Sequence, residues 1–159
     1  MKHLIKLLLI TLLFTSATLF AEEFKKPPYD KRLDLKVDGK LWYDYADTNS
    51  DFAYNLGVYY QQNLKEYKTA EFWYEYALNL NDKNINAIFN LCIIYEDRKE
   101  YDKAINLYKK AVQLNDTQAS INLGLLYSAQ ENYFEAIKYY KKAIEREFRW
   151  AEKPLTTLL

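Results

Sequence analysis

Three segments of the chain repeat the same order of residue types at nearly the same spacing. In each segment Asn, Leu, a small residue and Tyr are followed by Tyr, Ala, Tyr and Ala, and this second run has helical three- and four-residue intervals. The copies are Asn55, Leu56, Gly57, Tyr60, Tyr67, Ala70, Tyr74, Ala77; Asn90, Leu91, Cys92, Tyr95, Tyr101, Ala104, Tyr108, Ala111; and Asn122, Leu123, Gly124, Tyr127, Tyr133, Ala136, Tyr140, Ala143. A repeat period in the low thirties predicts an all-α solenoid of helical hairpins, each burying its apolar face against its neighbours.

The composition is that of a folded globular domain. Half of the residues are hydrophobic, 17% are aromatic and 28% are charged, so a disordered chain is excluded. The formal net charge is zero, and the Lys and Arg residues are scattered among Glu and Asp. A phosphate-binding surface needs clustered cations, and we therefore expect no nucleic acid partner.

The first 21 residues have the layout of a secretory signal peptide. Lys2 and Lys6 precede an apolar run over residues 7–20, and Ala21 is followed by a polar stretch. We expect cleavage after Ala21, with a cut after Ala17 as the second choice. The sequence thus predicts an exported protein of the periplasm or the extracellular space.

An uncleaved membrane anchor over residues 4–20 is the alternative interpretation. This run approaches the roughly 20 apolar residues that span a bilayer, although Thr and Ser side chains interrupt it. The preceding lysines place the rest of the chain outside the cytoplasm in either case. We expect membrane contact only through this segment, and only if it is uncleaved.

The mature chain divides into a leader and a repeat domain. Residues 22–37 show no periodic apolar pattern and predict an extended leader. Residues 38–159 form the repeat domain, which opens with a lone second-type helix near 38–47 in which Gly39 takes the column of Ala70. The alternation of residues 33–37 before Asp38 and Gly39 also permits a small hairpin.

The full units are expected at residues 51–82, 84–116 and 117–147. Polar side chains at the start of each first helix predict the N-caps, namely Ser50 or Asp51, Asn84 and Thr117. The last segment, residues 150–159, has Pro154 where Asn122 would align. We expect a short helix there that caps the solenoid.

These residues resemble tetratricopeptide repeats, with a secondary likeness to Sel-like repeats. The spacing from Ala77 to Cys92 is that of a tetratricopeptide repeat, whereas the spacing from Ala111 to Gly124 is that of a Sel-like repeat. The resemblance covers residues 51–147 and implies a short right-handed superhelix of about three hairpins. The recurring Leu, Ala and Tyr columns are then expected to form its core.

The resemblance also implies that the first helices line a concave groove for an extended peptide or a partner helix. The matching positions are Tyr54, Val58, Gln61, Phe89, Ile93, Glu96, Asp97, Ile121, Leu125 and Ser128. Most are apolar, which favours an apolar or amphipathic segment. The alternative is that they pack against neighbouring first helices. No Lys or Arg lies among them, which argues against capture of a terminal carboxylate.

The Asn column allows two interpretations. Asn55, Asn90 and Asn122 either contact a ligand or bond to the backbone or to one another between units. We favour the structural role.

Catalysis has few candidate residues. The only histidine, His3, lies in the signal segment, and the three glycines stand singly, so neither a nucleophile–imidazole pair nor a phosphate loop is present. Cys92 is alone and is interpreted as a small buried thiol. The acidic residues Glu96, Asp97 and Glu100 are interpreted as a solvated helix end. We therefore expect no enzyme, cofactor or metal.

The sequence favours an exported scaffold or adaptor that binds another envelope or secreted protein. The alternative is a cell-wall or glycan-associated accessory factor whose Trp42, Trp73 and Trp150 stack on sugar rings. Self-association through the terminal leucines is a further possibility, and these are Leu155, Leu158 and Leu159.

Overall fold

The computed structural model describes residues 25–35 and 38–156, and within them it contains helices and no strand. The predicted signal segment therefore lies outside the described residues. The elements are η1 (Lys31–Leu35), α2 (Gly39–Tyr45), α3 (Ser50–Tyr59), η2 (Tyr60–Leu64), α4 (Tyr67–Leu80), α5 (Ile85–Asp97), α6 (Tyr101–Gln113), α7 (Thr117–Ala129) and α8 (Tyr133–Thr156). The predicted all-α class is confirmed, and the hairpin alternative near Asp38 is wrong.

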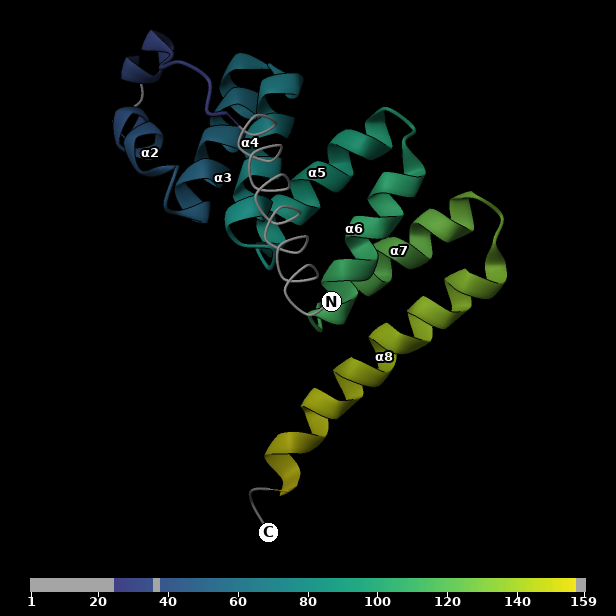
Figure 1. The fold of residues 1–159 in the computed structure, drawn as a ribbon. Coiled ribbons are helices and arrows are strands. Elements are labelled where there is room, and N and C mark those ends of the chain that lie inside the picture. The colour runs from purple at the N-terminus through teal and green to yellow at the C-terminus, as the bar shows by residue number, and fades with distance from the viewer. Residues whose placement is uncertain (1–24, 36–37, 157–159) are drawn as a thin grey trace, which may run out of the picture.

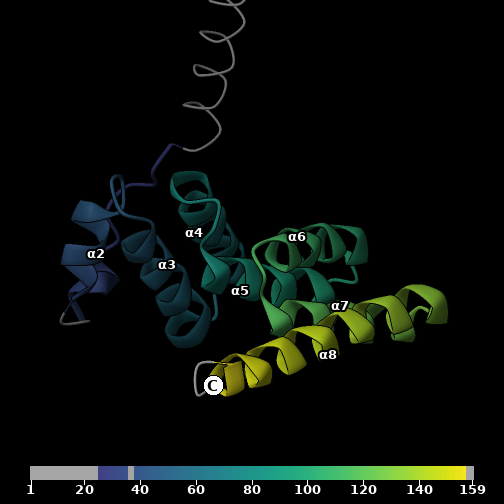
Figure 2. The same cartoon turned by 90° about the horizontal axis from the view of Figure 1, so that it is seen from below.

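The helices form a solenoid. Each element packs mainly on the elements before and after it in the chain, so α3 with α4, α5 with α6 and α7 with α8 make three successive hairpins. Figures 1 and 2 show these helices following one another in chain order from α2 to α8. This nearest-neighbour packing is the architecture that the repeat predicts.

The Leu and Ala columns form the core. Leu56, Leu91 and Leu123 are fully or almost fully buried, as are the six alanines of the repeat. One Tyr column departs from the prediction, because Tyr67, Tyr101 and Tyr133 are 47%, 36% and 61% exposed. Each of these tyrosines is the first residue of a second helix. At that position the side chain lies at the edge of the hairpin and not between helices.

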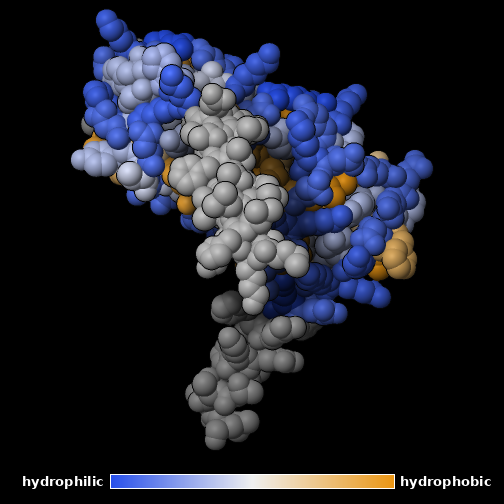
Figure 3. Space-filling view, viewed as in Figure 1, coloured by the Kyte–Doolittle hydropathy of each residue, from blue (hydrophilic) through white to orange (hydrophobic). Residues whose placement is uncertain are grey.

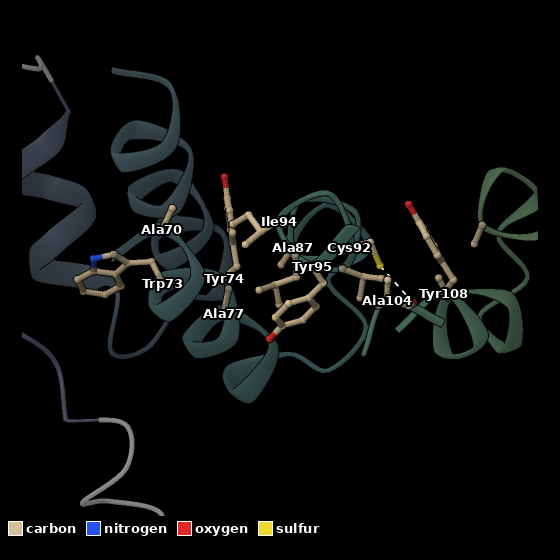
Figure 4. Close-up of a cluster of buried hydrophobic side chains, with 14 of the residues drawn as sticks. Ala70, Trp73, Tyr74, Ala77, Ala87, Cys92, Ile94, Tyr95, Ala104 and Tyr108 are labelled. Carbon is tan, nitrogen blue, oxygen red and sulfur yellow. Dashed lines mark hydrogen bonds between the residues drawn. The ribbon is translucent and has the colours of Figure 1, made fainter. Parts of the chain in front are cut away.

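The small-residue column lies where the two helices of a hairpin meet. A Cβ atom added at Gly57 would lie 2.5 Å from the Tyr74 ring, and one at Gly124 would lie 2.5 Å from the Tyr140 ring. Cys92 fills the same column in the middle unit, is fully buried and donates from Sγ to the Ala104 carbonyl oxygen at 3.6 Å (Figure 4). The interpretation of Cys92 as a buried thiol is confirmed.

Two of the predicted N-caps are wrong by one residue. Asn84 caps α5 as expected, since its Oδ1 accepts from Ala87 N at 3.1 Å. The cap of α3 is Asn49, and the cap of α7 is Asp116. Ser50 instead donates to the carbonyl oxygen of Ala77 at 2.9 Å. A cap must stand in extended backbone before the first helical residue, which Ser50 and Thr117 already are.

The predicted half-repeat helix is present as α2, but part of the leader is folded. Lys31–Leu35 form the 3-10 helix η1, where extended chain was expected. Leu33 is fully buried, and its carbonyl oxygen would lie 2.4 Å from a Cβ atom at Gly39. The leader folds because Leu33 takes a place in the core beside α2.

The segment in which a short capping helix is expected, residues 150–159, is helical as far as Thr156, but it continues α8 and is not a short helix of its own. Helix α8 runs without a break from Tyr133 to Thr156 and extends beyond the other helices in Figure 1. No Gly, Asn or Asp between Tyr133 and Pro154 interrupts the helical pattern. Among the described residues, no helix combines the length and apolarity needed to cross a bilayer.

Candidate functional site

The first helices leave one row of equivalent apolar side chains partly uncovered. Val58, Ile93 and Leu125 each follow the small-residue column directly, so they take the same place in successive units. Val58 is half-buried, whereas Ile93 is 47% exposed and Leu125 is 56% exposed. Together with the other seven predicted positions they make up what we call the first-helix face.

The other apolar residues of the first-helix face are half-buried. The Tyr54 ring lies 5.8 Å from the Tyr74 ring, and the Phe89 ring lies 5.8 Å from the Tyr108 ring, both measured between centroids. These two side chains therefore pack on the second helix of their own unit while keeping part of their surface open. Ile121 is half-buried as well. The face thus combines packed aromatic residues with the more exposed aliphatic side chains.

The polar members of the face lie toward the ends of the first helices. Glu96 and Asp97 close α5, Gln61 lies in η2, and Ser128 lies in the last turn of α7. Asp97 is exposed, and the other three are half-buried.

On the side of the molecule seen in Figure 3, hydrophobic residues form small patches within a mostly hydrophilic surface.

A repeated hydrogen-bond relay, absent from the predictions, joins one unit to the next. Asn90 Nδ2 donates to the Tyr74 hydroxyl at 3.0 Å, and that hydroxyl donates to Gln61 Oε1 at 2.6 Å. In the next unit Asn122 Nδ2 donates to the Tyr108 hydroxyl at 3.3 Å, and Tyr108 donates to Glu96 at 2.8 Å. The recurrence of Asn and Tyr in fixed columns is the sequence signal that could have revealed this relay.

The relay corrects the expectation for two of the three Asn side chains. Asn90 and Asn122 bond between units, but to a tyrosine hydroxyl and not to backbone or to each other. The residue of α2 that corresponds to Tyr74 is Tyr43, whose hydroxyl donates to the Pro27 carbonyl oxygen at 2.7 Å. The Pro27 carbonyl oxygen therefore takes the acceptor place that Gln61 and Glu96 hold in the later units.

Burial around the relay shifts proton equilibria away from the charged forms. Burial raises the pKa of the Tyr108 hydroxyl above its usual value, and the hydrogen bond to Glu96 adds to this shift. Burial likewise raises the pKa of the Cys92 thiol, with a further contribution from the negative charge of Glu96. A thiol held in its neutral form is a poor nucleophile, in agreement with the packing role of Cys92.

The remaining chemical candidates are engaged in structure. Glu96 accepts from Tyr108, and Glu100 forms an ion pair with Lys103. Among the described residues no group of His, Cys, Asp and Glu could hold a metal ion. Trp73 is completely buried and cannot stack on a sugar ring, Trp42 is half-buried, and the Trp150 side chain lies outside the described residues. The glycan alternative thus loses one of its three tryptophans.

The helical hairpins pack in succession and leave an apolar row exposed on their first helices. These are the features of helical-repeat interaction proteins. The family model described as "Anaphase-promoting complex, cyclosome, subunit 3", a tetratricopeptide-like repeat family, matches residues 63–143. The chain belongs to this tetratricopeptide-repeat family. Such repeats generally mediate protein–protein interaction and are typically non-catalytic.

Solved structures show the same fold. A crystal structure of MamA is 30% identical over 67% of this chain and 63% of its own, with a TM-score of 0.59. A second MamA crystal structure is 26% identical over 76% and 69% of the two chains, with a TM-score of 0.61. A structure titled "MamA MSR-1 C2" is 25% identical over 75% and 70%, with a TM-score of 0.56. The chain thus spans less than two thirds of the first of these relatives. No curated protein matched the sequence.

Proposed function

We propose that the protein is an exported, non-catalytic scaffold that binds another protein of the bacterial cell envelope through the first-helix face. One observation supports this most directly, namely the exposure of Ile93 and Leu125 at equivalent places in successive units. Contiguous exposed apolar surface is typical of interaction sites, and a partner segment that covers both side chains would gain from burying them. Removing apolar surface from water contributes about 25 cal/mol per square ångström, and the costs of association are subtracted from this gain.

The proposed binding face can be tested with charge-neutral substitutions. The variant Ile93→Ser with Leu125→Ser makes the row polar, and both sites are exposed enough to spare the core. The matched control is Leu41→Ser with Leu80→Ser, because these leucines of α2 and α4 are 46% and 38% exposed but lie outside the face. We expect partner capture from envelope extract to fall with the first variant only. Equal capture by both folded variants would overturn the proposed face.

Export rests on the pattern of residues 1–21 alone. We expect the protein expressed in a bacterium to appear in the periplasmic or extracellular fraction, with a mature N-terminus at Glu22 as read by mass spectrometry. A full-length chain in the membrane fraction would instead support the uncleaved anchor. A full-length chain in the cytoplasm would contradict both.

A further inference from the structure

Positive side chains are missing from the helices that carry the first-helix face. Helices α3, α5 and α7 and the turn η2 contain no Lys or Arg, although the whole chain has 22 of them. The charged residues of these elements are all acidic, namely Asp51, Glu96 and Asp97. The lysines that follow η2 and α5, Lys65 and Lys99, lie in turns outside the helices. The face is therefore apolar with a negative bias.

The negative charge is concentrated at the end of α5, where it is locally unfavourable. Glu96 and Asp97 occupy the last turn, which has no basic residue. The carboxyl end of a helix already carries partial negative charge, so acids there weaken the helix. The next cation, Arg98, forms its ion pair with Glu71 of α4 in the preceding unit. Residues that oppose the local preference of a helix, as these two acids do, are found mainly at functional sites.

The carboxylate of Glu96 is also held in place. It accepts from the Tyr108 hydroxyl at 2.8 Å, and Tyr108 is only 3% exposed and accepts in turn from Asn122. The corresponding relay of the preceding unit ends on the neutral amide of Gln61. The middle unit thus fixes a charged acceptor where the first unit fixes an uncharged one. Ile93 lies one turn before Glu96 on the same side of the helix.

We propose that the partner of the first-helix face is a protein segment with an apolar surface and adjacent Lys or Arg side chains. Ile93 and Leu125 take the apolar surface, and Glu96 takes a cation at one end. Complementary charge of this kind selects the partner and sets its direction along the face. The inference rests on the proposed function, because it specifies the chemistry of the segment bound at the same face.

Two synthetic fluorescent peptides test the inference by anisotropy. Both are amphipathic helices with the same Leu surface, and they carry either Lys or Glu at the flanking positions. We expect the Lys peptide to bind tighter, and Glu96→Gln to weaken it about fivefold, the effect of one well-placed ion pair. Glutamine keeps an acceptor for Tyr108, as Gln61 does for Tyr74. The control is Glu75→Gln on α4, whose carboxylate accepts from the Tyr95 hydroxyl at 2.8 Å, and it should leave binding unchanged.

The outcomes separate this inference from the proposed function. If both peptides bind equally, and Ile93→Ser with Leu125→Ser abolishes binding, the charge preference is wrong and the face remains. If Glu96→Gln binds the Lys peptide as well as the wild type does, Glu96 is not the anchor. If neither peptide binds, or if the serine variant still binds, the proposed function fails and the inference fails with it.

Discussion

At the scale of single residues, the tyrosine hydroxyls of the second helices connect one repeat unit to the next. Tyr74 and Tyr108 each accept from an Asn of the following unit, and within their own unit they donate to Gln61 of η2 and to Glu96 of α5. Tyr140 fills the same column in the third unit, but Pro154 stands where the next Asn would align, so the relay has no amide donor there. The three units are therefore alike in sequence but unlike in how they are joined.

The substitution Tyr108→Phe tests the weight of the relay. It removes one hydroxyl that makes two hydrogen bonds in a buried site, so we expect the free energy of unfolding to fall by about 1–3 kcal/mol. The change is measured by urea denaturation followed by circular dichroism. Tyr140→Phe is the matched control and should change stability by less than about 0.5 kcal/mol. Equal losses for the two variants would show that the two hydrogen bonds of the Tyr108 hydroxyl do not carry the effect.

At the scale of elements, the turns inside the hairpins share an unusual backbone. Lys65, Lys99 and Glu131 have φ values of 59°, 60° and 59°, in the left-handed region, and each stands two residues before the Tyr that opens a second helix. A side chain with a Cβ atom is disfavoured there, whereas glycine is not. The chain thus keeps mild strain at the same point of every unit.

Replacing Lys99 by glycine should relieve this strain. We expect Lys99→Gly to raise the free energy of unfolding by up to about 1 kcal/mol, since the gain from relaxed φ exceeds the added flexibility of the unfolded chain. The control is Lys103→Gly within α6, which should lower stability by about 0.5–1 kcal/mol. Both are read from thermal and urea unfolding. A loss of stability on Lys99→Gly would mean that the lysine side chain contributes more than its backbone costs.

The elements also show what sequence patterns reveal and what they miss. Helix spacing and the small-residue column predicted the hairpins, because Gly57 and Gly124 are required by direct contact with a ring. The exposure of Tyr67 was missed, because periodicity places a residue on a helix face but does not show where the partner helix ends. The unbroken α8 and the folded leader were missed for a related reason: a resemblance to whole repeat units says little about the segments that flank them.

The candidate site was predictable only in part. The positions of Ile93 and Leu125 follow from the repeat register, which also indicates that they share one side of the solenoid. The relay behind Glu96 depends on which rotamers bring three side chains within hydrogen-bond distance across two units. No local pattern encodes that distance. The recurring Leu and Ala columns predicted the packing, whereas the acceptor of the relay varies from Gln61 in the first unit to Glu96 in the second.

At the scale of the whole molecule, buried tyrosines make stability sensitive to alkali. Burial raises the pKa of Tyr76 to about 12, with help from the hydrogen bond to Asp47, and it raises the pKa of Tyr60, Tyr74 and Tyr95 still further above 10. A folded-state pKa above the unfolded value means that the stabilisation is complete below pH 10. It is lost as the pH rises through the folded-state pKa.

We therefore expect alkaline unfolding that follows tyrosine ionisation. The helical circular dichroism signal should hold up to about pH 10 and fall above it, together with a rise in the ultraviolet absorbance of phenolate. The control is added salt at a fixed pH below about 10. Screening of charges alone should leave the helical circular dichroism signal unchanged. Full phenolate absorbance with an unchanged helical signal would contradict the prediction.

The docked leader has a consequence for how the domain is held. Lys26 pairs with Asp47, the Pro27 and Arg32 carbonyl oxygens accept from tyrosines of α2 and α3, and Asp30 accepts from Tyr60. Residues 26–32 are therefore bonded to the repeat domain and do not act as a flexible linker in front of it. If the predicted signal segment stays uncleaved as an anchor, these contacts would transmit a force applied at Lys25 directly to α2, α3 and η2.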